Sequence, residues 1–147
     1  MSEADIISDL LKSAWLRDTF KLIRLKIEQP IAWLPELGGT STSKTADLVG
    51  VNKDNKIFAF EVKAPGCDIG LAFDQICGYC RGANFVYCIL FEGSVSETSL
   101  EKFRKTGMGL ITYSLRNDNR LNLLKLVLDS EDQKGENIQM TLKWFEE

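Results

Sequence analysis

The stretch ADLVGVNKDNKIFAFEVKA, residues 46–64, decides the fold. Two apolar runs flank NKDNK, whose Asn residues and Asp tolerate turn geometry, so the sequence predicts a β-hairpin. Three charges interrupt the apolar strands: Asp47 in the first, Glu61 and Lys63 in the second. A charge inside an apolar strand is costly unless it is paired or bound to a metal. We therefore take these three side chains as a candidate site.

Apolar periodicity predicts the elements on either side of this hairpin. Residues 3–28 carry a helical pattern with a break near Ser13, and Pro30 ends it. The following IAWLPELGG is expected to be a short strand or extended arm, and GGTSTSK a flexible loop. Further along, we expect hairpin strands at 45–51 and 56–64, helices at 69–82 and 96–105, and strands at NFVYCILFEG, GMGLITYSL and RLNLLKLVLDS, while NIQMTLKWFEE fits a helix or a strand.

Length, order of elements and charge bound the class of protein. Helices and strands in mixed order predict an α/β protein whose sheet has helices on both faces. A chain of 147 residues has the size of one domain, so we expect residues 1–147 to form a single domain. No secretory signal and no apolar run of about 20 residues is present, which predicts a cytoplasmic protein without a membrane span. The net charge of −3 argues against binding nucleic acid by bulk charge, but allows a local basic face.

The chain contains no histidine, which excludes a Ser-His-Asp triad, a Cys-His pair and a histidine metal ligand. A metal would be held by carboxylates and carbonyls, which favour magnesium, manganese or calcium, or else by thiolates. Cys67, Cys77, Cys80 and Cys88 lie close in sequence and leave a zinc or iron–sulfur site open. We favour core packing, because Cys77 and Cys80 fall in a predicted helix and Cys88 in a predicted buried strand.

The three charges of the hairpin suggest a specific chemistry. Side chains alternate across a strand, so Glu61 and Lys63 project from the same face. Asp47 joins them at the end of the sheet if the hairpin splays there. Two carboxylates and the carbonyl of Val62, with water, form a ligand set that suits a hard divalent cation. Such a cation polarises a phosphate and lowers the pKa of bound water, while Lys63 stabilises developing negative charge.

With these residues the chain resembles the PD-(D/E)XK nuclease superfamily. Asp47 precedes the hairpin turn and E-x-K follows it at 61–63, although Ala46 stands where the superfamily usually has proline. QICGY at 75–79 is similar to the Q-h-x-x-Y pattern of the RecB-like branch. The resemblance implies a restriction-endonuclease-like fold, a mixed β-sheet core flanked by helices on both faces. It also implies a deoxyribonuclease that hydrolyses DNA phosphodiester bonds with Mg²⁺ or Mn²⁺.

The resemblance assigns roles to single residues. The expected catalytic residues are Asp47, Glu61, Lys63 and Gln75, and the expected metal ligands are Asp47, Glu61 and the carbonyl of Val62. Gln75 would reach the metal-bound water or a phosphate. Many members of the superfamily add an acid from the first helix, and Glu3, Asp9 and Asp18 compete for that role here, with Glu36 as a fourth candidate.

Three residues are expected to contact nucleic acid. Tyr79 would meet the DNA backbone from the helix that carries Gln75, while Lys44 and Arg81 flank the site in sequence and would neutralise phosphates. The expected partner is DNA, with a homodimer or a partner protein to select the substrate. Two alternatives remain open: a non-catalytic nucleic-acid-binding or assembly module on the same fold, and an exposed strand face on which Glu61 and Lys63 are a solvated pair.

Overall fold

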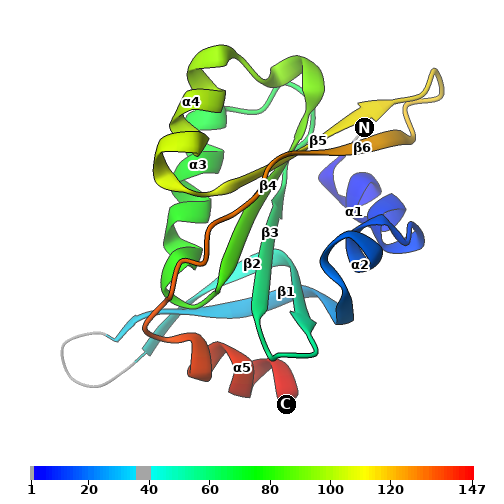
Figure 1. The fold of residues 1–147 in the computed structure, drawn as a ribbon. Coiled ribbons are helices and arrows are strands. Elements are labelled where there is room, and N and C mark those ends of the chain that lie inside the picture. The colour runs from blue at the N-terminus through cyan, green and yellow to red at the C-terminus, as the bar shows by residue number, and fades with distance from the viewer. Residues whose placement is uncertain (1, 36–40) are drawn as a thin grey trace.

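A computed structural model describes residues 2–35 and 41–147. Side chains are described for these residues except 33–35, 41 and 42. These residues form an α/β structure around one six-stranded sheet in the order β1-β2-β3-β4-β5-β6 (Figure 1). The β3–β4 and β4–β5 pairs are parallel and the other pairs antiparallel, so the sheet is mixed. The strands are β1 Leu22–Pro35, β2 Ser41–Asn52, β3 Ile57–Val62, β4 Phe85–Phe91, β5 Gly109–Leu115 and β6 Leu121–Leu128.

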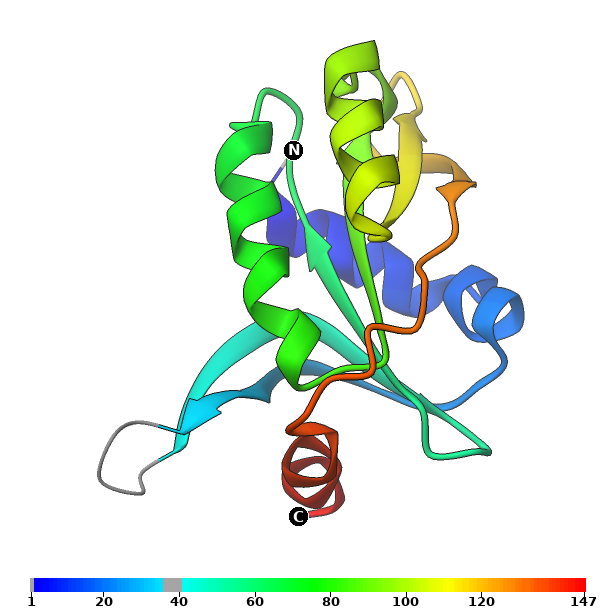
Figure 2. The same cartoon turned by 60° about the vertical axis from the view of Figure 1, so that its left-hand side comes forward.

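Helices cover both faces of the sheet, as the sequence predicts. They are α1 Glu3–Lys12, α2 Trp15–Phe20, α3 Ile69–Cys77, α4 Glu97–Thr106 and α5 Ile138–Glu146, with 3-10 segments η1 Gly78–Arg81 and η2 Glu92–Ser94. Figure 2 shows α3 and α4 in front of the sheet and α1 behind it. The two parallel connections, from β3 to β4 and from β4 to β5, run through α3 and α4.

The predicted hairpin is confirmed by β2 and β3. Asn52 shapes its turn, because the Asn52 side-chain oxygen accepts hydrogen bonds from the backbone N–H groups of Asp54 and Lys56, each at 3.0 Å. Asn55 takes the left-handed conformation, with φ of 59°, which asparagine tolerates better than most residues. The turn therefore sets the register in which Val51 lies opposite Ile57.

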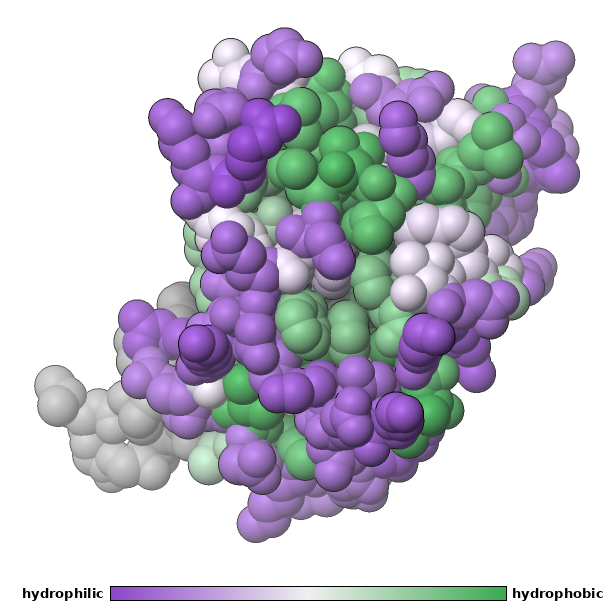
Figure 3. Space-filling view, viewed as in Figure 1, coloured by the Kyte–Doolittle hydropathy of each residue, from purple (hydrophilic) through white to green (hydrophobic). Residues whose placement is uncertain are grey.

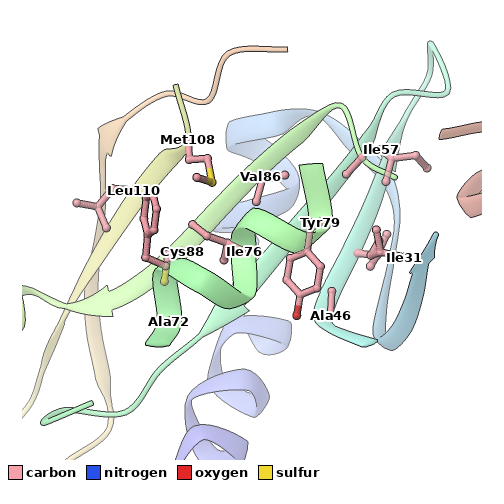
Figure 4. Close-up of a cluster of buried hydrophobic side chains, with 14 of the residues drawn as sticks. Ile31, Ala46, Ile57, Ala72, Ile76, Tyr79, Val86, Cys88, Met108 and Leu110 are labelled. Carbon is pink, nitrogen blue, oxygen red and sulfur yellow. The ribbon is translucent and has the colours of Figure 1, made fainter. Parts of the chain in front are cut away.

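Alternation along β3 divides the core into two clusters. Phe58 and Phe60 face the cluster under α1 and α2, whereas Ile57 and Ala59 face the cluster under α3, α4 and α5. Figure 4 shows part of the second cluster, in which Cys88 lies among apolar side chains. Glu61 continues the Ile57–Ala59 face and so enters this second, covered side of the sheet.

Two predicted elements are wrong. The loop expected at GGTSTSK is strand β2 in its described part, residues 41–44, because these residues pair with β1. The helical pattern expected over residues 3–28 breaks at Ser13, as predicted, but it ends with α2, and β1 begins at Leu22. Lys21 ends α2 in the left-handed conformation, with φ of 56°, which turns the chain out of the helix. The sequence IRLKIE from Ile23 to Glu28 then alternates apolar and charged residues, as a half-buried strand does.

The predicted strands of the second half are confirmed. The terminal segment that fitted a helix or a strand is the helix α5, and it is tied to β1 because the Ala32 N–H donates to the Thr141 hydroxyl oxygen at 2.9 Å. In the view of Figure 3, hydrophobic atoms gather near β5 and β6, while the part of this face towards α5 is hydrophilic. No helix in the described part of the chain is long and apolar enough to cross a membrane.

Candidate active site

The site forms where β2 and β3 separate. Their ladder ends at the pair Leu48 and Phe60, one residue before Asp47 and Glu61 would face each other. In place of a backbone partner, the N–H of Val62 donates to the Asp47 carboxylate at 2.8 Å. Asp47 therefore lies across the gap between the strands, with its side chain fixed by the backbone of the E-x-K segment.

Glu61 is a buried carboxylate with a protein partner at each oxygen. Its residue is only 5% exposed, and its Oε1 accepts a hydrogen bond from the Tyr79 hydroxyl at 2.6 Å. Its Oε2 lies 3.5 Å from the Nζ of Lys63, whose side chain is 17% exposed. This burial argues against an exposed strand face with a solvated ion pair, because water reaches neither group freely.

The pKa values of the site follow from burial and from the crowding of carboxylates. Burial raises the pKa of Glu61 to about 7, and the nearby Asp47 carboxylate adds to the rise, while the Tyr79 hydrogen bond and Lys63 oppose it. Burial also acts to lower the pKa of Lys63, but the carboxylates of Glu61 and Glu3 outweigh it, so this pKa is raised. Lys63 therefore stays a cation at neutral pH.

One of the acids expected from the first helix contacts Lys63. Glu3 lies at the start of α1, and its Oε1 is 3.6 Å from the Nζ of Lys63. Asp9 faces away from the site, because its carboxylate binds the Arg120 guanidinium and accepts from the Leu121 N–H. Asp18 lies exposed on α2, and Glu36 falls outside the described residues.

Gln75 and Tyr79, both expected to reach the substrate from one helix, lie in different surroundings. Gln75 is exposed on α3, but Tyr79 is buried in the core cluster of Figure 4. Its hydroxyl donates to Glu61 and also lies 3.1 Å from the carbonyl of Thr45. The expectation that Tyr79 meets the DNA backbone is corrected: the ring lies under α3 and the hydroxyl orients a carboxylate.

The two expected phosphate-binding cations lie in different surroundings. Lys44 packs its aliphatic stem and Nζ against Gly78, where an added Cβ would come within 2.7 Å of the lysine side chain. Lys44 is therefore held beside the segment that carries Tyr79. Arg81 pairs with Glu136 at 2.8 Å, in the segment before α5, and none of the contacts described for it involves the carboxylates of the site.

The residues present fit a hard divalent cation that takes only part of its ligands from side chains. Asp47 and Glu61 lie close enough to raise the pKa of Glu61, a repulsion that a bound cation relieves. Within residues 2–35 and 41–147, no three acidic or cysteine side chains group as metal ligands. Carbonyls, water and phosphate would therefore complete the shell, as Mg²⁺ prefers. The contact described for Val62 is its N–H to Asp47.

The cysteines, weighed above as a cluster, differ in their surroundings. Cys88 is buried in β4, as its apolar run predicts, whereas Cys77 is exposed on α3. Cys67 and Cys80 are half-buried. Burial raises the pKa of Cys80 to about 11 and that of Cys67 above its ordinary value. Burial also raises the pKa of Cys77 and of Cys88, whose thiol packs in the core.

Sequence reasoning missed Tyr113, which supports the site from β5. The Tyr113 ring is buried, and its hydroxyl donates to the backbone carbonyl of Lys63 at 2.7 Å. No local pattern in GMGLITYSL signals this contact, because it depends on how β3, β4 and β5 line up. The position of the E-x-K lysine is thus fixed from two strands away.

Comparison with known proteins gives a fold without a function. No family model matches the sequence, and no curated protein matches it. The SPO1766 protein of unknown function from Silicibacter pomeroyi is similar in structure, with a TM-score of 0.62 and 12% identity over 99% of this chain and 84% of that one. The crystal structure of SSO0001 matches with a TM-score of 0.35 and 13% identity over 95% of this chain and 55% of that one, a similarity too low to show a shared fold. The first similarity shows a shared fold alone.

Proposed function

We propose that this protein is a metal-dependent nuclease of the PD-(D/E)XK type, RecB-like branch, which hydrolyses DNA phosphodiester bonds. One observation carries the proposal: Asp47, Glu61 and Lys63 meet where β2 and β3 separate, and Asp47 is bonded to the backbone of the E-x-K segment. Hairpin, E-x-K strand and Q-x-x-x-Y helix follow one another in the order that a restriction-endonuclease-like core implies.

The two carboxylates would hold the cation. Asp47 and Glu61 supply negative oxygens, and the carbonyl of Val62 is the further ligand that the family resemblance suggests. When bound, Mg²⁺ or Mn²⁺ supplies charge stabilisation at the phosphate and lowers the pKa of water. Tyr79 holds Oε1 of Glu61 by a hydrogen bond at 2.6 Å, which keeps the carboxylate from rotating.

Lys63 supplies the fixed positive charge that the reaction needs. Water attacks phosphorus and releases one proton to the solvent, the bond from phosphorus to the leaving oxygen breaks, and the leaving oxygen takes up a proton from the solvent. Negative charge grows on the phosphate oxygens during this step, and a lysine held in a poorly hydrated site stabilises it strongly. Glu61 and Glu3 keep Lys63 protonated, which suits it to this role rather than to that of a general base.

Cleavage assays with matched variants test the proposal. Wild-type protein is incubated with labelled DNA and Mg²⁺ or Mn²⁺, beside Asp47→Ala, Glu61→Ala and the control Glu101→Ala. Glu101 is an exposed acid on α4 that pairs with Arg104. We expect cleavage to be lost in the first two variants and kept in the control, with all variants folded.

Two outcomes would redirect the assignment. Full cleavage by both site variants would contradict it, because neither carboxylate would then be needed. DNA binding by wild type without cleavage under any divalent metal would favour the non-catalytic binding or assembly module instead. A role for a homodimer or a partner protein in substrate choice stays part of the proposal.

A further inference from the structure

A second concave surface lies at the far end of α1 from Glu3. A cleft of about 530 Å³ opens between α1–α2 and the hairpin of β5 and β6, and we call it the hairpin cleft. Its walls include Lys12, Trp15, Arg116, Arg120 and Leu123. None of these residues belongs to the carboxylate site, and its volume is that of a site that encloses a small ligand.

Cations gather in the hairpin cleft. Lys12, Arg116 and Arg120 line it with the carboxylate of Asp9, and Asp118 pairs with Arg116 beside it. Arg116 is held by Asp118 through hydrogen bonds at 3.1 and 3.0 Å, and Arg120 by Asp9. A guanidinium has five N–H donors, so each arginine is fixed in place with donors left for a phosphate.

An aromatic ring stands beside these cations. Trp15 is half-buried and packs edge-on against Phe20, with ring centroids 6.2 Å apart at 86°. Leu123 on the opposite wall is 68% exposed, which is unusual for a large apolar side chain. A fixed indole beside exposed cations is the combination on which nucleic acid bases stack while phosphates are neutralised.

The hairpin cleft is linked to the candidate active site along α1. A second cavity, of about 390 Å³, lies between α1 and β1 and is lined by Ile7, Leu11 and Ile27. Lys12 lines both cavities, and Asp47 lines the second one. A ten-residue helix is about 15 Å long, so the two cavities lead from Asp47 to the cations within the reach of a few nucleotides.

We propose that this surface binds a single strand of DNA, which runs from the scissile phosphate at Asp47 past Lys12 into the hairpin cleft. There a base stacks on Trp15, and phosphates contact Arg116 and Arg120. A duplex keeps its bases stacked and paired, so only an unpaired strand can place a base in the recess. The inference rests on the proposed function and names its substrate: DNA with a single-stranded segment.

Salt-dependent binding tests the strand path without any need for cleavage. Binding of labelled oligodeoxythymidylate to the full chain is measured by anisotropy in EDTA over a series of salt concentrations. The test variant Lys12→Gln/Arg116→Gln is compared with Lys105→Gln/Arg104→Gln, which removes the same residue types from α4. Arg104 is a close match, because it is 53% exposed and pairs with Glu101, as Arg116 is 55% exposed and pairs with Asp118.

Each cation that contacts a phosphate of a single strand contributes about 0.7 to the slope of log affinity against log salt. We expect the slope to fall by about 1.4 in the test variant and to stay unchanged in the control. Trp15→Leu is expected to weaken binding about tenfold and to remove the quenching of tryptophan fluorescence by the strand. A duplex of the same length is expected to bind more weakly than the strand.

Several results would overturn the strand path. They are an unchanged slope in the test variant, an equal fall in the α4 control, or tighter binding of duplex than of strand without quenching at Trp15. These results leave the proposed function intact if Glu61→Ala still abolishes cleavage. A different result would contradict the carboxylate site and support the strand-binding surface. In that case the salt slope falls in Lys12→Gln/Arg116→Gln as expected, but Glu61→Ala still cleaves DNA.

Discussion

Replacing Glu61 with glutamine is expected to stabilise the metal-free protein at alkaline pH while abolishing cleavage. The folded state raises the pKa of Glu61 from 4.5 to about 7, mainly through burial. Between these values the folded chain binds the Glu61 proton more tightly than the unfolded chain does. The free energy of unfolding therefore falls as pH rises through this window, and the loss is complete above about pH 7.

The size of the effect follows from the same two values. The difference between 4.5 and about 7 corresponds to roughly 3 kcal/mol against the ionised form, with the opposing attraction of Lys63 already included. Glutamine keeps the volume and an oxygen for the Tyr79 hydroxyl, which donates to Glu61 at 2.6 Å. We therefore expect Glu61→Gln to raise the free energy of unfolding by about 1–3 kcal/mol at alkaline pH.

Urea denaturation in EDTA, at about pH 5 and about pH 8, measures the free energy of unfolding of wild type and of Glu61→Gln. We expect the variant to be more stable than wild type at the higher pH. At the lower pH the difference should be small, because Glu61 is largely protonated in the folded wild type. Glu101→Gln is the control, because this exposed acid should change stability by less than about 0.5 kcal/mol at either pH. A Glu61→Gln variant no more stable than wild type at about pH 8 would refute the reasoning.

Two further changes test the supports of the site, and a third tests the ion pair between α1 and the β5–β6 hairpin. Tyr79→Phe removes the hydrogen bond that lowers the pKa of Glu61, so the pH profile of cleavage should move upward. Tyr113→Phe frees the Lys63 carbonyl and should slow cleavage while DNA affinity stays unchanged. Asp9→Asn breaks the pair with Arg120, whose hydrogen bond lowers the pKa of Asp9. Urea denaturation should show a loss of stability at neutral pH, and this loss should vanish as pH falls through that lowered pKa.

Local sequence patterns predict much of the fold and of the candidate site. Alternation in IFAFEVK placed Glu61 and Lys63 on one face, and the turn residues of NKDNK placed Asp47 on the partner strand. Both inferences use neighbours in sequence, where geometry is nearly independent of the rest of the chain. Burial of Ile57 and Ala59 on the same face then shows why this acid–lysine pair is shielded from water.

Other features depend on contacts between distant segments. Residues from Leu22 onward fitted a helix, but pairing with β2 and the left-handed Lys21 make them a strand. Tyr79 fitted an exposed helical face, but the chain tightens into a 3-10 turn at Gly78, which has three residues per turn and directs the ring into the core. The choice of Glu3 over the other first-helix acids likewise needed the placement of α1 beside Lys63.

Calorimetric titration of Mn²⁺ or Mg²⁺ into wild type and into Glu61→Gln, with DNA cleavage followed on the same samples, tests the central claim most directly. We expect the cation to bind wild type and DNA to be cleaved, and both to be lost in the variant, because Asp47 and Glu61 together form the cation site. Glu61→Gln should remain folded, since its stability in EDTA is expected to equal or exceed that of wild type. Binding and cleavage that survive in Glu61→Gln would contradict the claim that this buried carboxylate holds the catalytic metal.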